Sequence, residues 1–123
     1  MQKHVKFDIP KDLGEKILQA VETARNSGKL RRGVNETTKA IEKGIAQLVV
    51  IAGDVEPEEI VMHLPGLCEE KNIPYAYVPS KLELGRSSGI DVGASAIAIV
   101  DAGEGKNSIK GIVSSLEQIK KAG

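Results

Sequence analysis

The polar residues best suited to chemistry in this chain lie in the stretch 29–39, which reads KLRRGVNETTK. A basic, strand-like tetrapeptide leads into Gly33, and glycine adopts backbone angles that other residues resist. Asn35 is a favoured helix N-cap, so it predicts a helix start. Asn35 and Lys39 are four residues apart and would share a helix face. We call Asn35, Glu36 and Lys39 the polar head, because together they present an amide, a carboxylate and an ammonium.

Positive charge is concentrated around this stretch, although the whole chain has a formal net charge of zero. Residues 1–50 hold ten lysines and arginines against six acids, whereas residues 51–78 hold one against six. The remaining residues, 79–123, hold six against five. An anionic partner responds to such a local patch and not to the net charge.

A purely structural interpretation explains only part of the stretch. Gly33 would be a turn, Asn35 a cap, and the rest of the polar head a solvated helix face. Positive charge near a helix N-terminus remains unexplained, because the dipole there repels cations. The cations concerned are Lys29, Arg31, Arg32, Lys39 and Lys43. Phosphate suits helix N-terminal amides, and lysine, asparagine and glutamate side chains all suit base edges. The pattern therefore indicates nucleic-acid binding.

The composition favours recognition of grooves and shape over base stacking. Only Phe7, Tyr75 and Tyr77 are aromatic, and the tyrosines fall in a strand-like run, so a stacking platform is poorly supported. No predicted helix has a continuous basic face for the DNA major groove. A loop between Gly89 and Gly93 would add an aliphatic wedge beside the head. The wedge would consist of Leu84, from the preceding segment, with Ile90 and Val92 from the loop itself. Burial under the sheet end is the alternative for the last two, and the flanking glycines argue against it.

Other motifs carry less weight. The segment 103–108, GEGKNS, lacks the first glycine and the Ser/Thr after lysine that a phosphate loop needs, so a solvated turn is predicted. Cys68 lies on an apolar helix stripe and His63 on another face, which predicts a buried, inert thiol. His4 lies in an N-terminal arm, and no metal-ligand cluster is recognisable. Helix-end electrostatics explains the acids at 54–59 more simply than acid–base or metal chemistry does. No catalytic residue, metal or cofactor is predicted.

Helical and strand-like segments alternate along the chain and must position these groups. Apolar runs predict strands at 47–52, 75–78 and 96–100, with a short strand at 29–32. Helices are predicted from Pro10 to a stop at 26–28, from Asn35 to about Lys43, from the acids at 56–59 to a stop at 72–74, over 81–86 and over 109–119.

These elements predict an α/β fold. At least three strands are apolar on both faces, which implies a sheet covered on both sides. We predict a three-layer α/β/α sandwich with a mixed sheet of about four strands, in which the strand at 96–100 is central. The stretch 29–39 and the loop at 84–92 would meet at one end of the sheet.

Length and composition suggest one domain, residues 1–123. No run approaches a membrane span, and the N-terminal residues lack the apolar core of a signal peptide. A single cysteine allows no internal disulfide, so a cytoplasmic location is expected. We expect a monomer in the absence of RNA.

Residues 33–44, GVNETTKAIEKG, closely resemble the signature of the kink-turn-binding ribosomal protein family, in particular that of its archaeal large-subunit branch, the seven-Ae type. The resemblance covers nearly the whole chain. It includes the segments 48–52, 63–65, 67–71, 73–75, 84–86, 89–92 and 94–95. One departure is Gly53, where the family often carries glutamate or another polar residue.

The resemblance implies an architectural RNA-binding protein and not an enzyme. Its implied targets are kink-turns and kink-loops, in which tandem sheared G·A pairs follow a bulge. These RNAs would belong to the large ribosomal subunit, box C/D and H/ACA guide particles and ribonuclease P, with roles in ribosome biogenesis and tRNA processing. In box C/D particles, the implied protein partners are a Nop-type scaffold and fibrillarin.

The resemblance also implies roles for individual residues. The polar head would contact the G·A pairs, and the loop 90–92 would pack on the bulged nucleotides. Lys29, Arg32 and Lys43 would meet the phosphate backbone. The complete implied set is Lys29, Arg32, Gly33, Asn35, Glu36, Lys39, Lys43, Arg86, Ile90, Asp91 and Val92.

Two alternatives remain at this point. One is a paralogue restricted to the ribosome. The other is a small-molecule or nucleotide-binding α/β domain, which would need a convergent acid–base or metal cluster that the sequence does not display.

Overall fold

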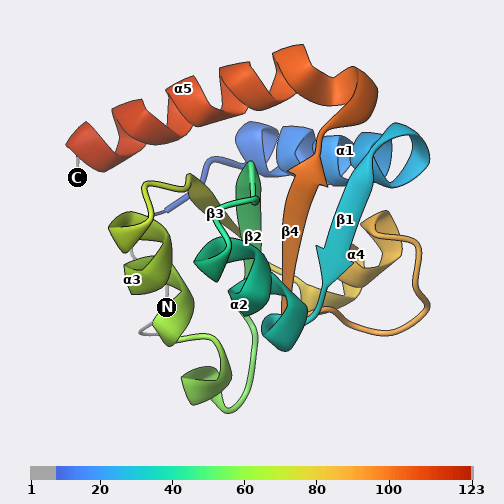
Figure 1. Cartoon of the computed structure of the whole chain (residues 1–123), viewed down its shortest axis with the longest axis vertical. Coiled ribbons are helices and arrows are strands. Elements are labelled where there is room, and N and C mark those ends of the chain that lie inside the picture. Colours follow the sequence, from blue (N-terminus) through green and yellow to red (C-terminus); the bar gives the residue numbers. More distant parts are fainter. Residues whose placement is uncertain (1–7, 123) are drawn as a thin grey trace.

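Apolar, β-branched runs form a four-stranded mixed sheet surrounded by helices (Figure 1). The computed structural model describes residues 8–122, so the predicted N-terminal arm with His4 lies outside the described residues. The helices are α1 (Lys11–Ser27), α2 (Val34–Glu42), α3 (His63–Glu70), α4 (Lys81–Ser87) and α5 (Lys106–Ala122). The strands are β1 (Lys29–Arg32), β2 (Leu48–Ala52), β3 (Tyr75–Val78) and β4 (Ala96–Asp101). Short 3-10 turns occupy Glu58–Ile60 and Gly103–Gly105.

The strand order is β1-β4-β2-β3. β2 pairs with β3 in parallel, whereas β4 is antiparallel to both of its neighbours, β1 and β2. Every residue of β2 and β3 is buried, as are the first four residues of β4. The prediction of a mixed sheet with the strand at 96–100 in its interior is therefore confirmed.

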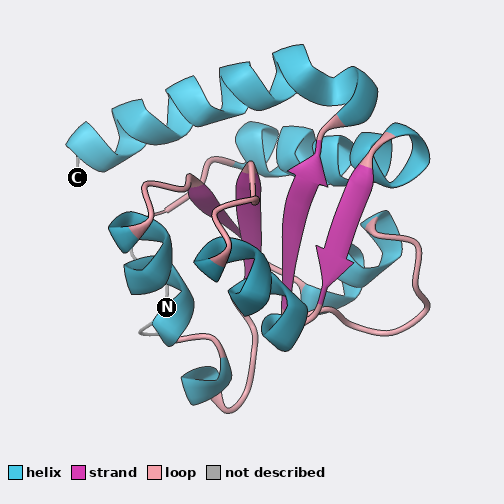
Figure 2. Ribbon diagram, in the orientation of Figure 1, coloured by secondary structure: helices cyan, strands magenta, loops and turns pink. Residues whose placement is uncertain are grey.

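Helices cover both faces of the sheet (Figure 2). α1 and α4 pack together on one face, and α2 and α3 pack together on the other. α5 crosses one end of the sheet and packs against α1. None of the helices within residues 8–122 is both long and apolar enough to cross a membrane.

The third helix starts later than its acidic residues predicted. Glu58 and Glu59 lie in a 3-10 turn, and α3 itself begins at His63. Proline is tolerated in the first turn of a helix but removes a backbone hydrogen bond in its interior. A start at His63 keeps Pro65 in the first turn, whereas an earlier start would place it inside the helix. The neighbouring acid Asp54 does act at a helix end, but at α4, where its Oδ1 accepts from the Lys81 N–H at 2.8 Å.

The loop after α4 folds back onto the helix at Gly85. The carbonyl oxygen of Gly85 accepts from the Ser88 N–H, the Ser88 hydroxyl and the Ile90 N–H. A Cβ placed on Gly85 would lie 1.9 Å from the carbonyl oxygen of Val92. The segment 88–94 can therefore approach this closely only because residue 85 has no side chain.

Replacing Gly85 with alanine tests this close approach. Gly85→Ala should destabilise the protein by about 1–3 kcal/mol, because an inserted methyl group must displace packed backbone. Gly111→Ala is the matched control, since Gly111 also lies in a helix and has nothing within 4 Å of its Cβ position. It should be neutral or stabilising by up to about 1 kcal/mol. Urea unfolding curves measure both effects, and equal behaviour of the two variants would contradict the assigned packing.

Candidate nucleic-acid interface

The polar head lies at the start of α2, which begins one residue earlier than predicted. Gly33 occupies the capping position with φ +91°, and its N–H donates to the Ala96 carbonyl at 2.9 Å. β1 thus passes into α2 through one glycine, because only glycine adopts this angle readily. The prediction that Asn35 caps the helix is wrong: no side chain bonds the first-turn amides, and Asn35 lies within the first turn. Its amide is exposed and is not used as a cap.

Glu36 and Lys39 pair with each other on the surface of α2. The Lys39 Nζ lies 3.2 Å from the Glu36 Oε2, with side-chain exposures of 63% and 50%, respectively. Such an exposed pair contributes little stability and breaks easily. Both charged groups therefore remain accessible to a ligand.

α2 is anchored to α3 just behind the head. The Thr38 hydroxyl donates to the Val34 carbonyl at 2.8 Å and lies 2.9 Å from the His63 Nε2. Because the hydroxyl proton is already used, the His63 Nε2–H is the donor of the second bond. The first turns of α2 are thus held by a side-chain bridge while the polar head points outward.

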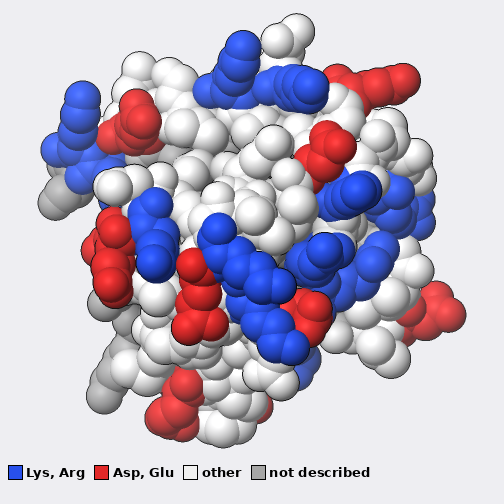
Figure 3. Space-filling model, viewed as in Figure 1, with Lys and Arg blue, Asp and Glu red and all other residues white. Residues whose placement is uncertain are grey.

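The five cations do not all gather around the helix start, although the sequence pattern predicted that they would. Lys43 is the C-cap of α2, at the opposite end of a nine-residue helix about 13 Å long. A lysine at that end is stabilised by the dipole and needs no anion. Lys29 lies at the start of β1, away from Gly33. The five cations instead lie along β1 and α2, where Figure 3 shows a band of lysines and arginines with acids among them. We call Lys29, Arg31, Arg32, Lys39 and Lys43 the basic band.

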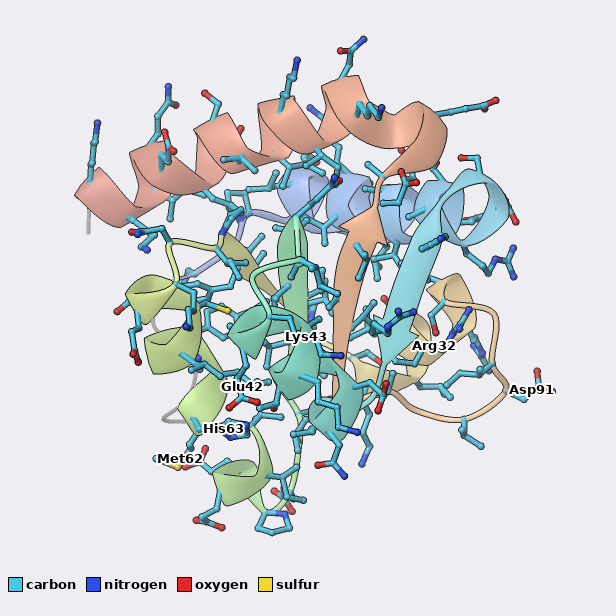
Figure 4. All side chains as sticks on the ribbon, in the orientation of Figure 1. Arg32, Glu42, Lys43, Met62, His63 and Asp91 are labelled. Atoms are coloured by element: carbon cyan, nitrogen blue, oxygen red, sulfur yellow. The ribbon has the colours of Figure 1, made fainter. Side chains whose placement is uncertain are left out.

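The loop after α4 presents one strongly exposed apolar residue. Val92 is 66% exposed, and Asp91 points outward from the same loop (Figure 4). Ile90 is half-buried and packs on the core, so it is available only in part. Leu84 is fully buried, and its predicted place in an aliphatic wedge is wrong because the inner face of α4 packs under the sheet. Arg86 is exposed in the last turn of α4.

The two candidate elements meet, as predicted. Arg32, the last residue of β1, donates from its Nε and Nη2 to the Ser88 carbonyl, the Nε bond being 2.8 Å long. Figure 4 shows Arg32 lying between β1 and the loop that carries Asp91. Sequence reasoning missed Ser88 altogether, because nothing local marks a contact between residues 56 positions apart.

The described residues offer little to the catalytic alternatives. Residues 8–122 contain no group of three or more His, Cys, Asp or Glu side chains that could hold a metal ion. Cys68 is fully buried, and burial is the main cause that raises its pKa to about 12, with the Glu69 carboxylate adding to it. The thiol is therefore protonated at neutral pH and a poor nucleophile. Tyr75 and Tyr77 are buried in β3, so neither can stack on a base.

Comparison with known proteins also relates this chain to RNA-binding proteins. The family described as ribosomal protein L7Ae/L30e/S12e/Gadd45 matches residues 15–109. Among solved structures, the chain is similar to the Giardia lamblia 15.5kD RNA binding protein, with 32% sequence identity and a TM-score of 0.91. That similarity covers 97% of this chain and 99% of the other.

The family match includes α2 and the loop after α4, and therefore the polar head and the Arg32–Ser88 contact, as well as all four strands of the described sheet. The structural match extends over almost the full length of both chains. The chain belongs to the L7Ae/L30e/S12e/Gadd45 family of ribosomal proteins.

Proposed function

We propose that this protein is an architectural RNA-binding protein that recognises kink-turn and kink-loop RNA. One observation carries the proposal: an exposed amide, carboxylate and ammonium at the start of α2 stand beside an exposed loop that is bonded to β1. The printed name of the Giardia lamblia protein, which describes RNA binding, supports it. We infer a binding role and not a catalytic one, which the descriptions of the matched family and of the Giardia lamblia protein support.

The polar head would read base edges. Lysine suits guanine O6 and N7, asparagine bonds a base edge bidentately, and glutamate accepts from base N–H groups. Tandem sheared G·A pairs expose such edges in a widened groove, where a short helix start can reach them. The weak Glu36–Lys39 pair would exchange its partners for bases at little cost.

The other elements would hold the RNA around the head. The basic band, apart from Arg32, whose guanidinium is bonded to the Ser88 carbonyl, suits a phosphate backbone that runs beside the groove along β1 and α2. Val92 and the exposed part of Ile90 would pack on the bulged nucleotides, whose bases are no longer stacked. The protein would bind the kinked RNA better than the extended form and so shift the population toward it.

The proposal extends to a cellular setting. We place the protein with the archaeal large-subunit branch of its family, in the large ribosomal subunit, box C/D and H/ACA guide particles and ribonuclease P. It would be cytoplasmic and monomeric before RNA binding, with a Nop-type scaffold and fibrillarin as partners in box C/D particles. One kink-turn motif in each of these RNAs would explain how one small protein serves all of them.

A comparison of two stems tests the proposed function directly. A kinked stem with tandem sheared G·A pairs should bind at least tenfold more tightly than the same stem with Watson–Crick pairs, because each good bidentate contact is worth about 1–3 kcal/mol. Gel shifts at fixed salt measure the ratio. Equal affinity for the two stems would leave only non-specific electrostatics and overturn the proposal.

Truncation of the polar head should weaken binding without unfolding the protein. Glu36→Ala or Lys39→Ala should each cost roughly 1–3 kcal/mol of affinity for the kinked stem. Lys110→Ala, which removes an exposed charge from α5, is the control and should bind as the unmodified protein does. Circular dichroism melting checks the fold. Unchanged affinity in both head variants would remove the head from the interface.

The phosphate role of the basic band has a different signature. Lys29→Ala should weaken all RNA targets alike and lower the slope of log affinity against log salt by about one, because one fewer counterion is released. Binding isotherms at several salt concentrations measure the slope. A loss confined to the G·A stem would assign Lys29 to base recognition instead.

A further inference from the structure

The Arg32 side chain is bonded within the protein, in a way that a residue serving only as a phosphate contact would not need to be. Its Nε and Nη2 both donate to one backbone carbonyl, that of Ser88. Ser88 is the C-cap of α4, and the last carbonyls of a helix lack partners within the helix. A cation that bonds such a carbonyl also interacts favourably with the negative end of the helix dipole. Arg32 therefore acts as a C-terminal cap for α4, supplied from β1.

A second arginine lies beside the turn that follows. Gly89 has φ +92°, and a Cβ on it would lie 2.6 Å from the Arg25 Cδ and 2.9 Å from its Nη1. The Arg25 side chain thus lies across Gly89. Arginines from α1 and β1 bracket the Ser88–Gly89 turn, immediately before the exposed part of the loop.

The rest of the turn is fixed by bonds to α4. The Ser88 side chain is fully buried, and its hydroxyl donates to the Gly85 carbonyl at 2.8 Å. The Ile90 N–H donates to the same carbonyl at 3.0 Å. Movement of the Ser88 carbonyl would therefore move residues 90–92 with it, relative to the start of α2.

We infer that Arg32 is a positioning residue, which sets the loop 90–92 against the polar head through the Ser88 carbonyl instead of contacting phosphate. This inference rests on the proposed function, since the loop and the head are its two RNA-contacting elements. Arg32 is the last residue of β1 and is followed directly by Gly33 and α2. The same residue therefore adjoins the polar head through the backbone and bonds the loop through its side chain.

Charge and geometry separate the two roles of Arg32. A phosphate contact depends on the positive charge, which lysine preserves. Two simultaneous hydrogen bonds from one side chain to one carbonyl depend on the planar guanidinium group, which lysine lacks. Arg32→Lys is therefore the informative variant. Arg31→Lys is the matched control, because Arg31 is the adjacent exposed arginine of the same strand and points to the other side.

A measurement without RNA tests these hydrogen bonds themselves. Amide hydrogen exchange at Gly89 and Ile90, followed by NMR, should be faster in Arg32→Lys by about tenfold, as expected when a hydrogen bond to a charged group is lost. Exchange in the Arg31→Lys protein should match that of the unmodified protein. Equal protection at Ile90 in the Arg32→Lys and unmodified proteins would overturn the inference, whatever the RNA results show.

Binding to the kinked stem then tests the consequence. Arg32→Lys should lower affinity by about tenfold with an unchanged salt slope, and Val92→Ala should cost less in the Arg32→Lys background than alone, because coupled residues are not additive. Three results together would assign Arg32 to phosphate and overturn the inference. Arg32→Lys would bind with near-normal affinity, its loss would add to that of Val92→Ala, and Arg32→Ala would have a shallower salt slope. Failure of the unmodified protein to distinguish the G·A stem would instead refute the proposed function, while the exchange result would still decide whether Arg32 holds the loop.

Discussion

The pairing of the end of β1 with the start of β4 determines where everything else in the site can lie. Arg32 stands opposite Ile97, and the Gly33 N–H bonds the Ala96 carbonyl at 2.9 Å. Because these strands are antiparallel, the exit of one meets the entrance of the other. The chain that leaves β1 becomes the polar head, and the chain that enters β4 has just formed the loop after α4. A few backbone hydrogen bonds between β1 and β4 thereby bring the polar head and the loop after α4 together, although the two are distant in sequence.

The two sides of the site differ in stiffness. Residues 88–90 are held by the Gly85 carbonyl and by Arg32, so this part of the loop is ordered before any ligand arrives. Preorganisation of this kind reduces the entropic cost of binding. The head consists of exposed side chains joined only by a surface ion pair. Under the proposed function, the ordered loop would receive the bulged nucleotides, and the exposed side chains of the head would adjust to the edges of the G·A pairs.

Sequence reasoning succeeded where the signal is local and failed where it depends on distant partners. β3 was predicted with its observed bounds, and β4 was placed inside the sheet, because an apolar run without a polar face has few other solutions. The start of α2 was predicted one residue too late, since Gly33, whose N–H bonds the distant Ala96 carbonyl, takes the capping position. Lys43 is close to the head in sequence but lies at the opposite end of the helix. Whether the implied residues touch RNA stays a prediction.

The uneven charge described for this chain has a consequence for how two molecules approach each other. A protein with no net charge but with an excess of cations in residues 1–50 and an excess of acids in residues 51–78 has an uneven charge distribution and hence an electric dipole. In the field of an RNA, such a molecule experiences a torque and turns its basic side inward before contact. Between free copies, the same asymmetry favours attraction between the basic side of one molecule and the acidic side of another. A net charge of zero provides no overall repulsion to oppose this attraction. Moderate salt would screen that attraction. The free protein should therefore be more soluble at moderate salt than at low salt.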